Sequence, residues 1–210
     1  MSLRGKRILI TAGPTWVGID NVRVISNIAT GATGTLLARQ FSYRGARATL
    51  VLGPCRTFKL AKSIRIIHFC FFDELKNILR RELRNYKYDI IIHSAAVSDF
   101  KPEYKIRGKL CSDKSHYLKL LPLEKLIVLI NRLRRKGRLV MFKLESDVES
   151  KTLIQRAKRA RERFGADLVV ANRLRPYRAF IIERRGRVVA SAGSKQELAG
   201  KLIKLLSGLT

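Results

Sequence analysis

The chain has 210 residues, enough for one domain that buries about 70% of the surface of its unfolded chain. Its 44 Lys and Arg residues against 16 Asp and Glu residues give a formal net charge of +28, which indicates an anionic partner: nucleic acid, an anionic membrane surface or a substrate with several phosphates. No run of about 18 apolar residues occurs and the N-terminus lacks a signal-peptide core, so we expect a cytoplasmic protein that does not span a membrane.

The first stretch, residues 6–34, predicts a phosphate site. An apolar strand at residues 8–10 passes into the small residues 11–15, and a helix opens near Gly31 to Gly34. Backbone N–H groups and the positive end of a helix dipole favour an anion at such a junction. Gly31-x-x-Gly34 lacks a first glycine two residues earlier, and Gly13 is too far upstream to supply it, so the dinucleotide fingerprint is incomplete.

The middle of the chain alternates strands and helices. Because the residues that follow the strand at 89–93 are small, we expect ligand space at its carboxyl end. Apolar residues at helical spacing over 35–41, with a C-cap signal at 44–45, predict a helix, and strands are predicted at 48–52 and 64–67. Asp73 and Glu74 are expected to cap a second helix that stops near 85–86. The strand at 89–93 follows and leads into the small residues 94–98.

Residues 101–119 break this pattern. They combine Pro102, Gly108 and polar residues with six basic side chains: Lys101, Lys105, Arg107, Lys109, Lys114 and Lys119. We interpret the segment as a mobile basic arm. The alternative is a solvated connecting loop, since charged runs are often only solvated.

The remaining third continues the alternation. We expect Pro122 to start a helix that ends at 132–137, followed by a strand at 139–143. Ser150 or Thr152 is expected to cap the next helix, which ends at 164–165 and leads to a strand at 167–172. A hairpin at 178–182 and 187–190 and a closing helix at 194–206 complete the chain. The sequence therefore predicts an α/β fold: a mainly parallel sheet with helices on both faces and a C-terminal β-hairpin at its edge.

Cysteine and histidine provide no metal site. The three cysteines are odd in number and lack close pairing, which argues against a disulfide framework and a zinc site, and no two histidines share a helix face. These residues are Cys55, Cys70, Cys111, His68, His93 and His116.

A series of motifs occurs in order along nearly the whole chain: 11–15, Ile19-Asp20, Val22-Arg23, 25–27, Gly31-x-x-Gly34, 95–100, 108–110, Leu118-x-Leu120-x-Pro122-x-x-Lys125, Phe142-Lys143-x-Glu145 and 166–172. Together these motifs resemble the phosphopantothenoylcysteine synthetase family, also called phosphopantothenate–cysteine ligase, in a stand-alone form. The later segments look most like archaeal members of that family.

The resemblance implies a Rossmann-like fold, a homodimer and a single ligase-like domain at 1–210. It implies that the carboxylate of 4′-phosphopantothenate attacks the α-phosphate of CTP, or of ATP, with Mg²⁺ assistance and release of pyrophosphate. The amine of cysteine then attacks the acyl-nucleotide. Such chemistry needs alignment and charge neutralisation but no enzyme nucleophile. A separate decarboxylase protein is expected to act on the product.

The resemblance also implies roles for individual residues. Asn27 would hold the acyl phosphate through its amide, and Lys109 would reach the phosphates, with Lys105 as the competing alignment. Asp99 would bind the cytosine or order its loop, and Phe142 would pack beside the base. The full set of expected substrate and nucleotide residues is Gly13, Thr15, Arg23, Gly31, Gly34, Ala95, Ala96, Asp99, Lys105, Pro122, Lys125, Phe142, Lys158, Arg159 and Arg163.

The chain departs from the family pattern at four places. Ala32 stands where the family commonly has lysine, Trp16-Val17-Gly18 replaces Arg-Glu-Pro, and Arg173 replaces aspartate. Ala160 stands where a triphosphate-binding lysine aligns, so Lys158, Arg159 and Arg163 are expected to substitute for it. Two alternatives stay open: a basic nucleic-acid-binding protein on a Rossmann-like scaffold, and an NAD(P)-dependent reductase, which the incomplete glycine fingerprint disfavours.

Overall fold

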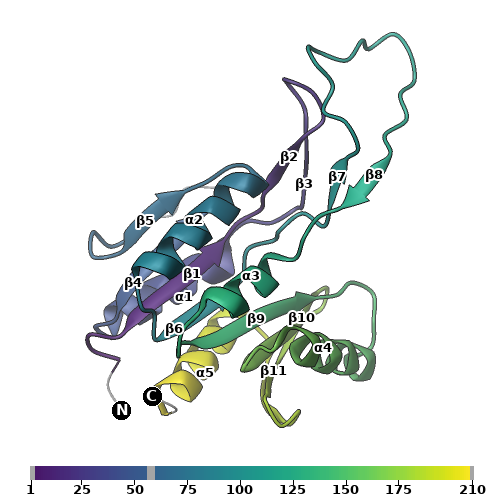
Figure 1. Ribbon diagram of the computed structural model, residues 1–210. Coiled ribbons are helices and arrows are strands. Elements are labelled where there is room, and N and C mark those ends of the chain that lie inside the picture. The colour runs from purple at the N-terminus through teal and green to yellow at the C-terminus, as the bar shows by residue number, and fades with distance from the viewer. Residues whose placement is uncertain (1–2, 56–59, 209–210) are drawn as a thin grey trace.

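The computed structural model describes residues 3–55 and 60–208, so residues 1–2, 56–59 and 209–210 of the expected domain 1–210 lie outside the described residues. The strands of its main sheet are β1 (Arg7–Ala12), β4 (Arg47–Leu52), β5 (Arg65–His68), β6 (Ile90–His93), β9 (Arg138–Leu144), β10 (Leu168–Leu174), β11 (Tyr177–Glu183) and β12 (Val188–Ala192). They form one eight-stranded sheet in the order β12-β11-β10-β9-β6-β1-β4-β5 (Figure 1).

The strand order reverses between β1 and β6. From β1 the chain continues to β4 and β5 on one side, then crosses to β6, β9 and β10 on the other, and all six of these strands are parallel. The strands β11 and β12 add antiparallel pairs at the far edge. In an open parallel sheet the carboxyl ends of the strands at such a reversal leave a crevice, which is the usual place for a ligand.

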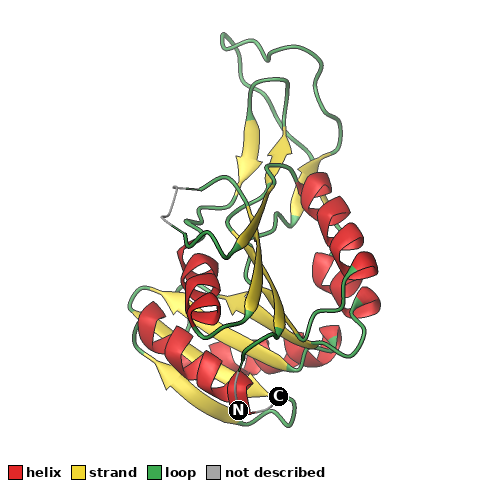
Figure 2. Ribbon diagram, turned by 90° about the vertical axis from the view of Figure 1, so that its left-hand side faces the viewer, coloured by secondary structure: helices red, strands yellow, loops and turns green. Residues whose placement is uncertain are grey.

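Helices cover both faces of the sheet (Figure 2). They are α1 (Ala32–Tyr43), α2 (Phe72–Asn85), α3 (Leu126–Leu133), α4 (Ser150–Phe164) and α5 (Lys195–Gly208). The helices α1 and α5 contact each other on one face, whereas α3 contacts both α2 and α4 on the other. None of the helices in the described part of the chain is both long enough and apolar enough to cross a membrane.

The central strands explain why the sheet is buried on both sides. Ile8 and Ile10 of β1 belong to the core beneath α1 and α5, while Leu9 between them belongs to the core beneath α2, α3 and α4. Side chains alternate between the two faces of a strand, so an unbroken apolar run fits a strand with a helical layer on each side. The prediction of an α/β sheet with a C-terminal hairpin at its edge is confirmed.

Three predicted helix starts differ from the structure. Pro122 does not start a helix: it ends a strand, and α3 begins at Leu126. The helix α2 begins at Phe72, before Asp73. The Glu74 carboxylate instead accepts N–H groups of the two residues that precede the helix. The helix α4 begins at Ser150 itself, so neither Ser150 nor Thr152 is its cap.

Two small ribbons project from the carboxyl edge of the sheet, and the sequence did not predict them. They are β2 (Trp16–Gly18) paired with β3 (Val24–Ser26), and β7 (Phe100–Pro102) paired with β8 (Leu120–Pro122). Both extend away from the sheet in the same direction (Figure 1). We call residues 16–28 and 100–122 together the projection; it contains the basic arm expected at 101–119.

Candidate active site

The carboxyl ends of β1 and β6 are joined by backbone hydrogen bonds. The N–H of Ala96 donates to the carbonyl of Gly13 over 2.9 Å, and the N–H of Thr15 donates to the carbonyl of Ala96 over 3.3 Å. Gly13 has φ 82°, and a Cβ there would lie 3.1 Å from the backbone of Gly53. A side chain at position 13 would therefore force the loops after β1 and β4 apart. The structure thus brings Gly13, Thr15 and Ala96 together at the strand reversal.

The helix α1 begins beside this crossing. Gly31 precedes the helix with φ 69°, a left-handed conformation that favours glycine. A Cβ at Gly34 would lie 2.5 Å from the Cβ of Ala12, so glycine lets the first turn of α1 pack directly against β1. The first turn has no acidic residue. The N–H of Ala32 donates to Oγ1 of Thr30 over 3.4 Å. The positive end of the helix dipole favours an anion at the strand ends.

Asn27 reaches across the crevice to the loop after β6. Its side-chain Nδ2 donates to the carbonyls of Ala96 over 3.1 Å and Val97 over 3.0 Å. The neighbouring Ser26 hydroxyl donates to the carbonyl of Thr15 over 3.1 Å. Both amide protons of Asn27 therefore have partners. Binding a phosphate through this amide requires Asn27 to exchange at least one of those carbonyls for the ligand.

Buried hydroxyls fix the same two loops. The N–H of Ser98 donates to Oγ1 of Thr15 over 2.8 Å, and Oγ of Ser98 lies 3.0 Å from it. Both residues are buried. A buried hydroxyl without a partner is unfavourable, so this mutual pairing holds the loops in one arrangement. Thr15 is expected to bind substrate; in the structure its hydroxyl links the loop after β1 to the loop after β6.

His93 at the end of β6 was not among the expected site residues. Its Nδ1 lies 2.9 Å from Oγ1 of Thr11, which also accepts the N–H of Ala95 over 3.2 Å. Burial lowers the pKa of His93 to about 4, so the imidazole is neutral at physiological pH. The signal available in the sequence was its position as the last residue of an apolar strand directly before Ser94 and Ala95.

Asp99 and Lys125 form an ion pair at the base of the projection. Pro122 lies beside them, because it pairs with Phe100 at the end of the β7–β8 ribbon. The N–H of Leu123 then donates to the carbonyl of Asp99 over 2.8 Å. The structure therefore groups Asp99, Pro122 and Lys125, although Pro122 does so from a strand rather than from the expected helix.

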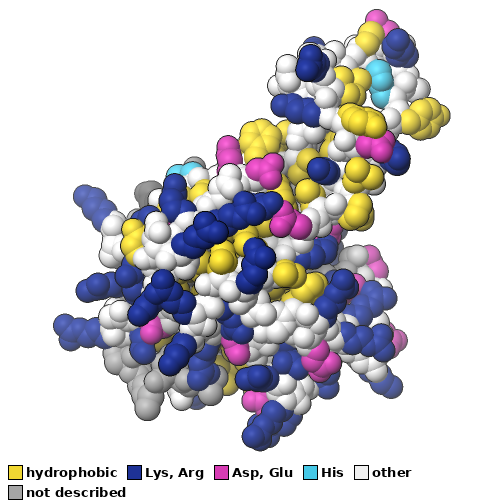
Figure 3. Space-filling view, in the orientation of Figure 1, with side chains coloured by type: hydrophobic (Ala, Val, Ile, Leu, Met, Phe, Trp, Pro, Cys, Tyr) yellow, Lys and Arg dark blue, Asp and Glu magenta, His cyan; other side chains and the backbone are white. Residues whose placement is uncertain are grey.

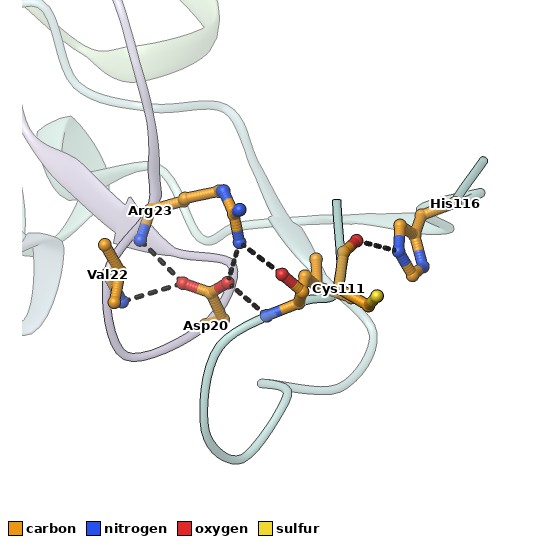
Figure 4. Close-up of polar contacts among 6 residues, drawn as sticks. Asp20, Val22, Arg23, Cys111 and His116 are labelled. Carbon is orange, nitrogen blue, oxygen red and sulfur yellow. Dashed lines mark hydrogen bonds and ion pairs between the residues drawn. The ribbon is translucent and has the colours of Figure 1, made fainter. Parts of the chain in front are cut away.

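Asp20 lies in the turn between β2 and β3 and holds the two ribbons together. Its carboxylate accepts the N–H groups of Val22, Arg23 and Leu110 over 2.6 to 2.9 Å. The Arg23 guanidinium adds a bond of 2.6 Å to Asp20 and one of 3.2 Å to the carbonyl of Leu110. Figure 4 shows these donors converging on the buried carboxylate. Arg23, expected to bind substrate, is placed here as part of a clasp.

These donors lower the pKa of Asp20 well below its ordinary value, the N–H of Leu110 first. Two backbone bonds extend the clasp: the N–H of Asn21 donates to the carbonyl of Gly108, and the N–H of Ile106 donates to the carbonyl of Ile19. The segment expected as a mobile basic arm is thus bonded to the β2–β3 turn. Its mobility stays a prediction.

Lys105 and Lys109 lie on this outer part of the projection. The Lys105 side chain passes beside Gly18, and Lys109 is exposed. Gly18 is three residues beyond Thr15, and Lys109 follows Gly108, whose carbonyl accepts the N–H of Asn21 in the β2–β3 turn. Both lysines therefore lie along the projection in this arrangement.

The carboxyl end of β9 adds a charged group next to β6. Phe142 is half-buried against the core, and Lys143 pairs with Glu145 over 3.0 Å. Arg156 of α4 pairs with the same carboxylate over 2.7 Å. Burial acts to raise the pKa of Glu145, but Lys143 and Arg156 hold it below its ordinary value. Lys143 and Glu145 belonged to the matching motifs and were not expected as site residues.

Lys158, Arg159 and Arg163 lie at the other end of the sheet. The helix α4 starts after the carboxyl end of β9 and runs back, so its last turns reach the amino ends of the strands. Lys158 there lies beside Gly186 in the β11–β12 turn, and Arg163 stacks 5.3 Å from the ring of Phe164. Within one chain, the structure does not bring these three residues together with the crevice.

Comparison with known proteins gives a family match over the chain. The model described as the DNA/pantothenate metabolism flavoprotein C-terminal domain matches residues 3–209. The chain is 37% identical over 178 residues to the coenzyme A biosynthesis bifunctional protein CoaBC of Thermococcus kodakarensis, covering 84% of this chain and 43% of that protein. It is 32% identical over 213 residues to CoaBC of Borreliella burgdorferi, covering 97% and 53%. The chain spans about half the length of these curated relatives.

Solved structures share the fold. The DNA/pantothenate metabolism flavoprotein from Streptococcus pneumoniae superposes with a TM-score of 0.87 at 23% identity, covering 98% of this chain and 100% of that chain. A Cab2 mutant in complex with phosphopantothenate-cysteine superposes with a TM-score of 0.76 at 19% identity, covering 98% and 87%. At these identities the superpositions show a common architecture.

Proposed function

This chain belongs to the family of DNA/pantothenate metabolism flavoprotein C-terminal domains, and from that premise we propose that it is a phosphopantothenate–cysteine ligase. A carboxylate oxygen of 4′-phosphopantothenate attacks the α-phosphorus of a nucleoside triphosphate, and the bond from that phosphorus to pyrophosphate breaks. The cysteine amine then attacks the acyl carbon, loses a proton and displaces the nucleoside monophosphate. The product would be phosphopantothenoylcysteine, and the similar Cab2 mutant structure is a complex with phosphopantothenate-cysteine.

The observation that carries this proposal is the group of small residues, N–H donors and an amide at the strand reversal. It combines the N-terminus of α1, the small residues Ala95 and Ala96, and the amide of Asn27 on one edge of the sheet. An acyl phosphate forms there between two charged substrates, so fixed N–H donors can stabilise the charge without a nucleophilic side chain. We assign Asn27 to the acyl phosphate, on the condition that it releases a loop carbonyl when the ligand binds.

We propose that the nucleotide lies along the carboxyl ends of β6 and β9. Asp99 and Lys125 would contact it from the base of the projection, and Phe142 would flank the base. Lys109 or Lys105 would reach its phosphates if the outer projection bends toward the crevice, since both lysines lie on the projection. CTP is our first choice of nucleotide and ATP the second.

Magnesium would enter on the triphosphate. The described residues offer no group of three His, Cys, Asp or Glu side chains that could hold a metal ion. Mg²⁺ commonly keeps several waters and binds phosphate oxygens with few protein ligands, which suits this crevice. The protein's own contribution would be the cations and N–H groups that position the phosphates.

We also propose a homodimer formed through the projection. Eight of the fifteen exposed large apolar residues of the described chain lie on it: Val22, Val24, Ile28, Phe100, Tyr104, Tyr117, Leu118 and Leu120. The apolar side chains gather on the projecting part in the space-filling view (Figure 3). Burying such a patch against a second copy is favourable. Size-exclusion chromatography with light scattering tests this: Phe100→Asp with Tyr117→Asp should give a monomer, and an unchanged mass would reject this interface.

Two further expectations stay predictions. One is that the enzyme works in the cytoplasm. The other is that a separate protein decarboxylates the product, whose cysteine carboxylate a later step must remove.

One assay tests the proposed function. Purified protein is incubated with 4′-phosphopantothenate, cysteine, Mg²⁺ and either CTP or ATP, and pyrophosphate release is measured. Release should require the acid and one of the two nucleotides, and omission of cysteine should leave the acyl-nucleotide bound. Absence of release with both nucleotides would reject the ligase. Reduction of a nicotinamide cofactor in its place would favour the reductase alternative.

A further inference from the structure

The amino edge of the sheet, opposite the candidate active site, carries a row of exposed cations that the ligase reaction does not use. The helices α2, α3 and α4 all run back from the carboxyl edge, so their C-termini line up there next to the β11–β12 turn. Nine exposed basic residues occupy these four places: Arg84, Lys87, Arg132, Arg135, Lys136, Arg159, Arg163, Arg184 and Arg185. We call them the basic band.

Hydrogen bonds connect the segments of the band. The guanidinium of Arg135 donates to the carbonyl of Arg84 over 3.3 Å, joining the end of α3 to the end of α2. Arg134 is adjacent to Arg135 in the sequence but is not a band residue. Its guanidinium donates to the carbonyl of Gly165 over 3.0 Å and joins the end of α3 to the end of α4. Arg134, Gly165 and Arg184 also line one cavity of about 310 Å³. The band is therefore one surface rather than four separate ones.

The carboxylates of this edge do not neutralise the band. Five acidic residues lie in the same segments, and each pairs with a basic residue outside the band: Glu82 with Arg65, Asp89 with Lys6, Glu162 with Arg161, Asp167 with Arg134 and Glu183 with Arg187. No ion pair within 4.0 Å is found for the nine band residues among the described residues. The band therefore keeps its positive charge.

Helix C-termini ordinarily repel anions because their last carbonyls carry negative partial charge. Here arginines cover those carbonyls, since Arg134 and Arg135 donate to Gly165 and Arg84, and the buried Arg161 donates to the carbonyl of Ala166 over 3.5 Å. The negative ends of two helices are thus compensated from within the fold. An approaching polyanion meets guanidinium and ammonium groups first.

We propose that the basic band binds the phosphate backbone of a nucleic acid duplex without reading its sequence. Packed helices lie about 8–10 Å apart, so three helix ends span about 20 Å. A duplex carries one phosphate charge per about 1.7 Å of its axis, so a length of about 20 Å carries about 12 phosphates. Roughly half of these, about six, would face the band.

The composition of the band favours a duplex over the other polyanions. None of the exposed large apolar residues of the described chain lies in its segments, so it offers no anchor for a membrane interface. The half-buried rings of Tyr86 and Phe164 each have an arginine over them, so they offer no open face for unpaired bases.

The test measures binding of purified protein to short duplex DNA and duplex RNA by fluorescence anisotropy over a range of KCl concentrations. If about five phosphates are neutralised, the logarithm of the association constant should fall with the logarithm of salt with a slope of about −4.5. The test variant combines Lys87→Gln, Lys136→Gln and Arg185→Gln, one residue from each of three segments. The matched control removes the same charge from the opposite helical face through Arg39→Gln, Lys195→Gln and Lys204→Gln.

The test variant should bind about tenfold more weakly than the control variant, and its salt slope should be shallower by about 2.7 if each of the three residues neutralises one phosphate. Pyrophosphate release should be the same for wild type and both variants, since none of these residues lies at the crevice. An equal loss of duplex affinity in both variants would show an effect of net charge alone and would overturn the proposal that the band binds duplex. Absence of duplex binding at physiological salt would overturn it too, as would tighter binding to phosphatidylserine vesicles than to duplex.

Discussion

The sheet and the projection are held together by opposite means. In the sheet, Ile10 and Ile92 are fully buried in a core shared with α1 and α5. In the projection, Phe100, Tyr104 and Tyr117 are exposed, and a buried carboxylate, Asp20, joins the two ribbons. Burial of apolar area stabilises the first region, and a few charged and backbone hydrogen bonds stabilise the second.

This difference implies that the two regions can respond separately to mutation and to pH. A strand in the sheet loses contacts on both faces when a core side chain shrinks. The projection instead depends on the ionisation of one group and on the geometry of its donors. Substitutions and pH changes that act on one region therefore measure how far the stability of the projection is independent of the stability of the sheet.

The largest effect is expected in the core of the sheet. Ile92→Ala should lower the free energy of unfolding by about 3 kcal/mol, because it removes buried methylenes and leaves a cavity. Chemical denaturation measures this, and Ile66→Ala is the control, since Ile66 is 38% exposed and should cost less than about 1 kcal/mol. Equal losses for the two variants would contradict the contrast between core and edge.

Asn27→Asp tests the junction of the two regions. A carboxylate cannot donate to the carbonyls of Ala96 and Val97, and it repels a phosphate. We expect turnover in the pyrophosphate assay to fall about 100-fold, or about 2.7 kcal/mol, with an unchanged circular dichroism spectrum. Asn77→Asp, on the exposed side of α2, should leave turnover unchanged. Normal turnover of Asn27→Asp would remove Asn27 from the site.

Asp20→Asn should loosen the projection and leave the sheet intact. An asparagine NH₂ would face the donors of Leu110 and Arg23, so the equilibrium constant for local opening should rise about tenfold or more. Hydrogen exchange should accelerate in residues 103–119 and stay the same in β1 and β6. Asp113→Asn is the control, because Asp113 is exposed and its carboxylate accepts from the side chains of its sequence neighbours Cys111 and Ser112. Loss of global stability equal to that of a core variant would show that the two regions are coupled.

Lowering the pH should produce the smallest and most gradual effect, first in the sheet. The unfolded chain protonates His93 near pH 6.5 while the fold keeps its pKa at about 4, so the unfolded state binds more protons between these values. Stability should thus be full above pH 6.5 and fall by about 1 kcal/mol at pH 6. His93→Gln should flatten this fall.

The projection should respond at lower pH. The pKa of Asp20 is lowered in the fold, so its contribution is full above the unfolded value of about 3.9 and is lost as pH falls through the lower folded value. Loosening of residues 103–119 at the same pH as the sheet would contradict the separation of the two regions.

The sequence predicted the sheet well because its strands are long apolar runs separated by amphipathic helices. The β-hairpin at the edge and the position of the crevice followed from the same alternation. The ribbons β2–β3 and β7–β8 were missed because three-residue strands carry no periodicity. What holds them is Asp20 and its contacts with Leu110, 90 positions later in the chain.

The three α4 residues show a second limit. Motif alignment placed Lys158, Arg159 and Arg163 with the triphosphate, but a helix rises about 1.5 Å per residue. Residues eight or more positions beyond Ser150 therefore lie at least about 12 Å from the carboxyl edge at which α4 begins. The place of Arg159 and Arg163 in the basic band follows from the direction of the helix, which the α/β alternation already implied.

The basic band lies at one end of the sheet and the crevice at the other, which has a practical consequence. A negatively charged resin or electrode should adsorb the protein in one preferred orientation, with the ribbons turned toward the liquid. Substrates could then reach an immobilised catalyst without a fusion tag or a chemical crosslink.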